Sequence, residues 1–136
     1  MMVSGGENGG GWKVEVEVIS PTGNVSCSVP DLPQPRFGHT INNNIVCGGE
    51  GGTDTETSCD QLTSAGWTRS HTLQYRRSDH CSWEVKDGII LLGGINSRNT
   101  AEIAKWDGTT EELINFLKYD TLYSPFCTCF EYIHIL

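Results

Sequence analysis

The chain has 136 residues, sixteen glycines, six cysteines and a formal net charge of −8. This length suits one ordinary domain, and the negative charge argues against nucleic-acid binding through a basic face. No apolar run approaches the length that spans a bilayer, so we expect no membrane span. The first residues show no basic segment followed by an apolar core, so no signal peptide is predicted.

Three short apolar segments that each end in a glycine pair divide the chain into repeats. The pairs are Gly5-Gly6, Gly48-Gly49 and Gly93-Gly94, so their first glycines are 43 and 45 residues apart. In the third segment, the four apolar residues 89–92 between turn signals are too few for a helix and suit a strand covered on both faces. A period near 45 residues predicts a repeat protein.

Between the glycine pairs, turn residues separate short alternating or apolar segments, and we expect each segment to be a strand. In chain order the expected strands are 13–18 and 25–29, then 40–42, 45–47, 58–62 and 67–73, then 81–85, 89–92, 100–106 and 110–114. Residues 7–11 and 50–56 are polar and glycine-containing, so we expect a turn and a loop there. The pattern stops at Phe116.

Two units also carry an Arg-x-x-His segment before their first strand. The order of this segment, a short hairpin, an apolar strand, a glycine pair and two outer strands resembles the kelch repeat. The residues that carry the resemblance are Gly5 and Gly6, then Arg36, His39, Gly48, Gly49 and Trp67, then Arg77, His80, Gly93, Gly94 and Trp106. The resemblance covers roughly residues 2–115. The sequence departs from the kelch pattern after the glycine pairs, where Cys27 and Cys59 lie near positions that usually hold aromatic residues.

The resemblance implies an all-β fold: a partial kelch-type β-propeller with two full four-stranded antiparallel blades and partial flanking blades. It divides the chain into the second half of a blade at 1–30, blades at 31–74 and 75–115, and an incomplete blade or irregular tail at 116–136. It also implies a protein–protein interaction module without catalysis or a cofactor. The alternative is a fragment of a propeller enzyme, galactose oxidase-like or sugar-processing, with its active residues in missing blades.

Six cysteines in a loop-rich chain allow a disulfide framework. Cys47 ends one expected strand and Cys59 begins the next, which runs back antiparallel to it. Opposed residues of such a pair come near the spacing that a disulfide needs, so we expect a Cys47–Cys59 bond. Cys27 and Cys81 are alternative partners.

Other candidate sites have a structural explanation that we prefer. Ser78, Asp79 and His80 are the residue types of a hydrolase triad, but consecutive strand residues point to opposite faces. We expect the repeated arginines and histidines to bond loop carbonyls between blades. His39, His80, Cys47 and Cys81 match no metal-ligand spacing, so we expect no metal site. The aromatic residues Trp67, Trp83, Trp106 and Tyr75 are expected to pack in the blades rather than to line a recognition surface.

The compartment is left open by the sequence. Asn24-Val25-Ser26 is an N-glycosylation sequon, and together with the cysteines it favours an extracellular location.

Overall fold

The computed structural model describes residues 2–20, 22, 25–51, 54–55, 57–95 and 102–116. The predicted glycosylation site Asn24 and the predicted tail lie outside the described residues. All regular secondary structure in the described part of the chain is β, as the sequence predicted. No helix in this part is long and apolar enough to cross a membrane.

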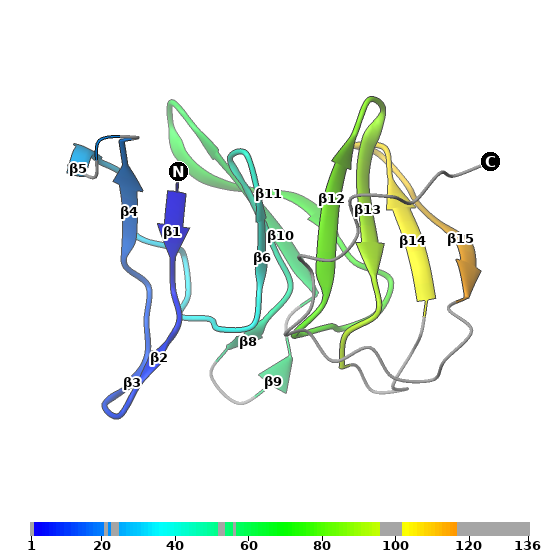
Figure 1. Ribbon diagram of the computed structural model, residues 1–136, viewed down its shortest axis with the longest axis horizontal. Helices are drawn as coiled ribbons and strands as arrows, with labels where there is room; N and C mark the ends of the chain where they lie inside the picture. The colour runs from blue at the N-terminus through cyan, green and yellow to red at the C-terminus, as the bar shows by residue number, and fades with distance from the viewer. Residues whose placement is uncertain are drawn as a thin grey trace.

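Three antiparallel sheets form the body of the molecule, and they stand side by side from left to right in Figure 1. The first sheet contains β1 (Met2–Ser4), β4 (Val16–Ile19) and β5 (Val25–Ser28). The second contains β6 (Thr40–Asn42), β7 (Ile45–Cys47), β10 (Ser58–Thr63) and β11 (Gly66–Thr72). The third contains β12 (Cys81–Val85), β13 (Gly88–Leu92), β14 (Glu102–Trp106) and β15 (Glu111–Phe116). The expected four-stranded antiparallel sheets are therefore confirmed, and the sheets are open.

The segments after the first two glycine pairs were expected to be a turn and a loop, but each contains a short hairpin. These hairpins are β2 (Glu7–Asn8) with β3 (Gly11–Trp12), and β8 (Glu50–Gly51) with β9 (Asp54–Thr55). Both project from the lower side of the molecule in Figure 1. Two-residue strands carry too little hydrophobic pattern to be recognised in a sequence.

Strand β4 begins at Val16 rather than at the predicted residue 13. The backbone before it is bonded elsewhere: Lys13 N–H donates to Gly6 O at 2.9 Å, and Leu32 N–H donates to Val14 O at 2.8 Å. These residues connect the glycine pair to the following unit instead of extending the sheet.

Two apolar clusters hold neighbouring sheets together. Between the first and second sheets lie Val16, Leu32 and Val46, with Met2, Val14, Val29, Ile41 and Trp67 packed around them. Between the second and third sheets lie Cys47, Cys59, Leu73, Ile89, Leu91, Ala104 and Trp106. The second sheet thus buries both of its faces, one against each neighbour, as an inner unit of a stacked repeat array must.

Candidate functional site

The boundaries between sheets repeat the same backbone contact at the glycine pairs. The second glycine of a pair donates its N–H to the carbonyl of the arginine in the next unit: Gly6 to Arg36 at 2.8 Å, and Gly49 to Arg77 at 2.9 Å. The first glycine leaves room for this approach. A Cβ on Gly48 would lie 2.5 Å from Arg77 O and 2.8 Å from His80 Cε1.

Both arginines of the repeated segment are completely buried, at 0% exposure. Arg36 Nη1 donates to the carbonyls of Gly48 and Ser58, each at 3.3 Å, and Arg77 Nη1 donates to Gly93 O at 3.1 Å. Each guanidinium also meets a carboxylate: Arg36 lies 2.7 Å from Asp60, and Arg77 lies 3.8 Å from Glu111. The arginines are thus bound to the strand ends of their own sheets.

The two carboxylates come from different strands. Asp60 lies on β10 opposite Val46, and the corresponding position on β14, opposite Leu91, is Ala104. Glu111 on β15 replaces the missing charge. Its other oxygen lies 3.6 Å from His71 Nε2 and accepts the Gln74 N–H at 2.6 Å, so it also joins the second sheet to the third.

The two histidines contact hydroxyl groups of the preceding unit rather than the carbonyls expected from the sequence. His39 Nε2 lies 2.9 Å from Ser4 Oγ, and His80 Nε2 lies 2.9 Å from Thr40 Oγ1. Burial and the nearby Arg36 charge lower the pKa of His39 to about 4. Burial and the charges of Arg77 and His39 lower the pKa of His80 to about 3. Both imidazoles are therefore neutral at pH 7.

Acidification is expected to destabilise the fold through these histidines. Their pKa values are lower in the folded chain than the ordinary 6.5, so the unfolded chain binds more protons below that pH. The contribution of the two neutral histidines to the stability of the folded chain is complete above pH 6.5. It is lost as the pH falls towards their folded-state pKa values of about 4 and about 3. Each histidine contributes a slope of up to about 1.4 kcal/mol per pH unit.

Urea unfolding at intervals between pH 7.5 and pH 5 measures this slope. In His80→Asn, half of the histidine contribution to the slope should disappear. An unfolding free energy that stays constant from pH 6.5 to pH 5 in the wild-type chain would contradict the burial of neutral histidines.

The residues of the apparent triad do not converge. Ser78 Oγ donates to Glu50 Oε1 at 3.2 Å, whereas His80 faces Thr40. Asp79 has a φ of 48°, and its N–H donates to Gly38 O at 2.8 Å. Each member therefore has a different partner. Among the described residues, no three His, Cys, Asp or Glu side chains are grouped as metal ligands.

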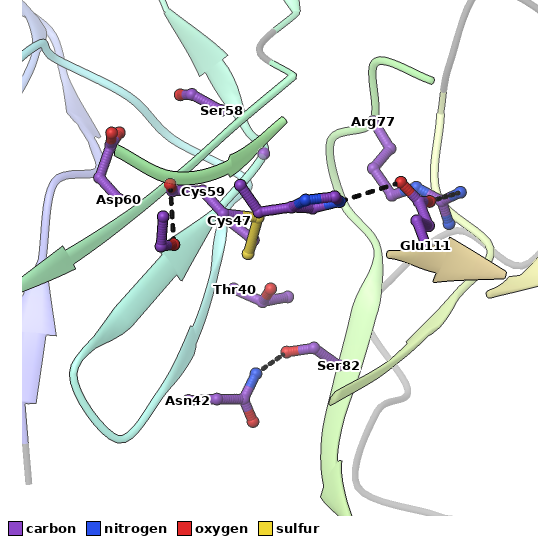
Figure 2. Close-up of a disulfide and its surroundings, with 12 residues drawn as sticks. Thr40, Asn42, Cys47, Ser58, Cys59, Asp60, Arg77, Ser82 and Glu111 are labelled. Atoms are coloured by element: carbon purple, nitrogen blue, oxygen red, sulfur yellow. Dashed lines mark hydrogen bonds and ion pairs between the residues drawn. A yellow bond between two sulfur atoms is a disulfide. The ribbon is translucent and has the colours of Figure 1, made fainter. Parts of the chain in front are cut away.

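The predicted disulfide between Cys47 and Cys59 is confirmed. The two residues are directly opposed on β7 and β10, with a Cα–Cα distance of 4.1 Å. Their side chains lie in the cluster between the second and third sheets, close to Thr40 in Figure 2. The bond thus joins two neighbouring strands at the point where the glycine pair begins.

Some of the aromatic residues pack inside the molecule, as expected, and others are exposed to solvent. Trp106 is buried and stacks on His71 with a centroid distance of 5.0 Å, and Trp67 donates its indole N–H to Pro30 O at 2.8 Å. Trp83, in contrast, is 44% exposed. Sequence reasoning did not consider Trp12, which is 36% exposed and stacks on Phe37 at 5.9 Å.

A cleft of about 290 Å³ lies between the turns of the second and third sheets. It is lined by Asn42, Asn43, Asn44, Ile45, Glu84, Val85, Lys86, Gly88, Ile89, Trp106, Asp107 and Gly108. Two hydrogen bonds cross the boundary between the sheets beside it, from Asn42 to Ser82 and from Asn43 to Glu84 (Figure 2 shows the first). These amide nitrogens are therefore already engaged in joining the sheets.

A second surface lies at the hairpins that follow the glycine pairs. We call it the hairpin surface and define it by Trp12, Phe37, Glu50 and Asp79. Phe37 stacks on Trp12 and pairs with Glu50 through a β-bridge. Glu50 accepts a hydrogen bond from Ser78 Oγ at 3.2 Å, and burial, then the nearby charge of Glu50, raise the pKa of Asp79. The surface thus combines a stacked aromatic pair, of which Trp12 is 36% exposed, with two acidic groups.

Comparison with known proteins identifies no family for this chain. No family model matches the chain, and no curated protein matches it significantly.

Proposed function

We propose that the chain is part of a kelch-type β-propeller and serves as a protein-binding module through its hairpin surface. The observation that carries this proposal is the difference between repeats at this surface. The arginine and the histidine recur in both Arg-x-x-His segments, whereas Phe37-Gly38 in one corresponds to Ser78-Asp79 in the other. The recurring arginines are buried between the sheets. Of the varying residues, Phe37 lies against the hairpins, stacked on Trp12 and paired with Glu50, whereas Ser78 is itself buried.

The chemistry of the hairpin surface suits a basic peptide. A cation near the face of Trp12 gains a cation–π contact, and Glu50 and Asp79 supply negative charge beside it. Exposed aromatic residues are also typical binding anchors. We therefore propose a protein partner that presents an arginine or lysine next to an apolar residue. No observation on the described residues favours the alternative propeller enzyme, and we propose no reaction.

Selection of random peptides on the immobilised, oxidised chain tests this function. We expect the enriched peptides to contain arginine or lysine beside apolar residues. Their affinity should fall about thirtyfold or more in Trp12→Ala, because an aromatic anchor contributes about 2 kcal/mol or more when it is central to an interface. Glu50→Gln should weaken binding and reduce its salt dependence.

The matched control is Leu113→Ala, which removes another exposed apolar side chain, 45% exposed, from β15. This variant should bind the selected peptides like the wild type. Peptides that bind Trp12→Ala and the wild type equally would contradict the proposed surface.

A further inference from the structure

The first sheet differs from the other two at one edge. In the second sheet β7 lies between β6 and β10, and in the third sheet β13 lies between β12 and β14. The strand at this position of the first sheet is β1, which ends at a glycine pair like β7 and β13. In the described part of the chain, β1 pairs only with β4. Its outer edge therefore offers backbone N–H and C=O groups at a place that β6 and β12 occupy in the other sheets.

Glu15 in the first sheet holds the position of Ser58 in the second. Gly48 N–H donates to Ser58 O at 3.0 Å, and the same bond runs from Gly5 N–H to Glu15 O at 3.0 Å. In the second sheet, Arg36 binds at this place, where it donates to Ser58 O at 3.3 Å and to Ser58 Oγ at 3.0 Å. An arginine at the same place on the first sheet would find a carboxylate instead of a hydroxyl group.

Glu17 and Val3 likewise hold the positions of Asp60 and Val46. Val46 pairs with Asp60, and Val3 pairs with Glu17. In the second sheet Val46 is 0% exposed, and Asp60 is buried in its ion pair with Arg36. In the first sheet Val3 is 45% exposed, and Glu17 is exposed as well. The first sheet thus presents to solvent the residues that form a buried arginine site in the second.

These positions form a site for an added strand, which we call the acceptor site and define by the outer edge of β1 with Val3, Gly5, Glu15 and Glu17. We infer that the acceptor site binds an extended segment of a separate polypeptide that carries an Arg-x-x-His sequence followed by a short strand. The strand pairs antiparallel with β1, as β6 pairs with β7. The arginine donates to the first glycine of the pair and forms ion pairs with the two carboxylates.

The chain itself shows what kind of segment fills such a site. Ile41 on β6 pairs with Val46 and packs in the cluster that faces the first sheet. An apolar residue at the same place in the added strand would lie opposite Val3 and cover it. Two copies of the chain paired edge to edge through β1 would bring no arginine to the carboxylates, because β1 is Met2–Ser4. We therefore propose the Arg-x-x-His segment as the partner rather than a second copy.

Binding of a peptide with the sequence of residues 34–43 to the full, oxidised chain tests the inference. This segment contains Arg36, His39 and β6, so it has the chemistry of the partner. Fluorescence anisotropy of the labelled peptide should show saturable binding. A methyl group on the backbone nitrogen of Thr40 should abolish binding, whereas one on that of Ile41 should not, because only alternate N–H groups of an antiparallel strand face its partner. No saturable binding, or equal binding of both methylated peptides, would overturn the inference.

The ion pairs are tested by removing either charge. Glu17→Gln in the chain should weaken binding about tenfold, and a peptide with Arg36→Gln should bind the wild type about tenfold more weakly. Combining the two changes should cost less than the product of the single effects, because both remove the same contact. The matched control is Glu112→Gln, which removes an exposed carboxylate from β15 and should leave binding unchanged. Equal affinities of Glu17→Gln and Glu112→Gln would contradict the arginine site.

Two further results separate this site from other occupants. The acceptor site shares no residue with the hairpin surface, so Trp12→Ala should bind the peptide like the wild type. A loss in Trp12→Ala without a loss in Glu17→Gln would place the peptide on the hairpin surface and overturn the inference, whatever the fate of the function proposed above. Sedimentation should show a monomer without peptide. A dimer that Val3→Lys dissociates and the peptide does not would make a second copy the occupant and would also overturn it.

Discussion

Replacing Asp60 with alanine is expected to lower the free energy of unfolding by about 3–5 kcal/mol, because it leaves a buried charge without its partner. The Arg36 guanidinium is 0% exposed and lies 2.7 Å from Asp60, whose side chain is 4% exposed. The remaining contacts of Arg36 include neutral carbonyls, which do not offset its charge. The loss is therefore large compared with the 5–15 kcal/mol of a typical domain.

The same carboxylate offers a matched control on its exposed side. Arg69 Nε lies 2.8 Å from the other oxygen of Asp60, but the Arg69 side chain is 51% exposed. Arg69→Ala should therefore cost no more than about 1 kcal/mol. Urea unfolding of both variants measures the difference. Equal losses in Asp60→Ala and Arg69→Ala would show that Arg36 is not held as a buried ion pair.

Gly48→Ala is expected to separate the second sheet from the third and to cost at least about 3 kcal/mol. Two effects add. Gly48 has a φ of +63°, where a side chain costs about 1–2 kcal/mol. In addition, the new Cβ would lie 2.5 Å from Arg77 O, a backbone atom that cannot move without displacing the next sheet.

Gly66→Ala separates the two effects. Gly66 has a φ of +102°, and a Cβ there would meet nothing within 4 Å. This variant carries backbone strain without a contact between sheets, so its loss in thermal unfolding experiments should be clearly smaller. A Gly48→Ala chain that is as stable as Gly66→Ala would mean that the glycine pair is not a close contact between sheets.

The sequence predicted the parts of the fold that depend on short-range pattern. The glycine pairs mark the ends of β1, β7 and β13 because the chain turns there with positive φ at both glycines. The Cys47–Cys59 bond was predicted because Cys47 ends one expected strand and Cys59 begins the next antiparallel one, although Cys27 and Cys81 stayed open as alternative partners.

Contacts between units were not predictable in the same way. The partner of Arg77 is Glu111, which lies on the last strand of its sheet, whereas the partner of Arg36 is Asp60 on the third strand. The repeat pattern does not predict that the carboxylate partner of the arginine lies on a different strand in each sheet, because this depends on which side chains reach the space between two sheets. The stacking of Trp12 on Phe37 was missed for a similar reason, since it joins two different repeats.

The first two glycine pairs each bond to the arginine of the next unit and so fix neighbouring sheets together. Hydrogen exchange by NMR on a chain labelled with ¹⁵N-glycine tests it directly, residue by residue. The amides of Gly6 and Gly49, which donate to Arg36 and Arg77, should exchange many-fold more slowly than that of Gly10, which bonds only to the exposed Asn8 side chain. Exchange of Gly6 and Gly49 as fast as that of Gly10 would contradict the claim.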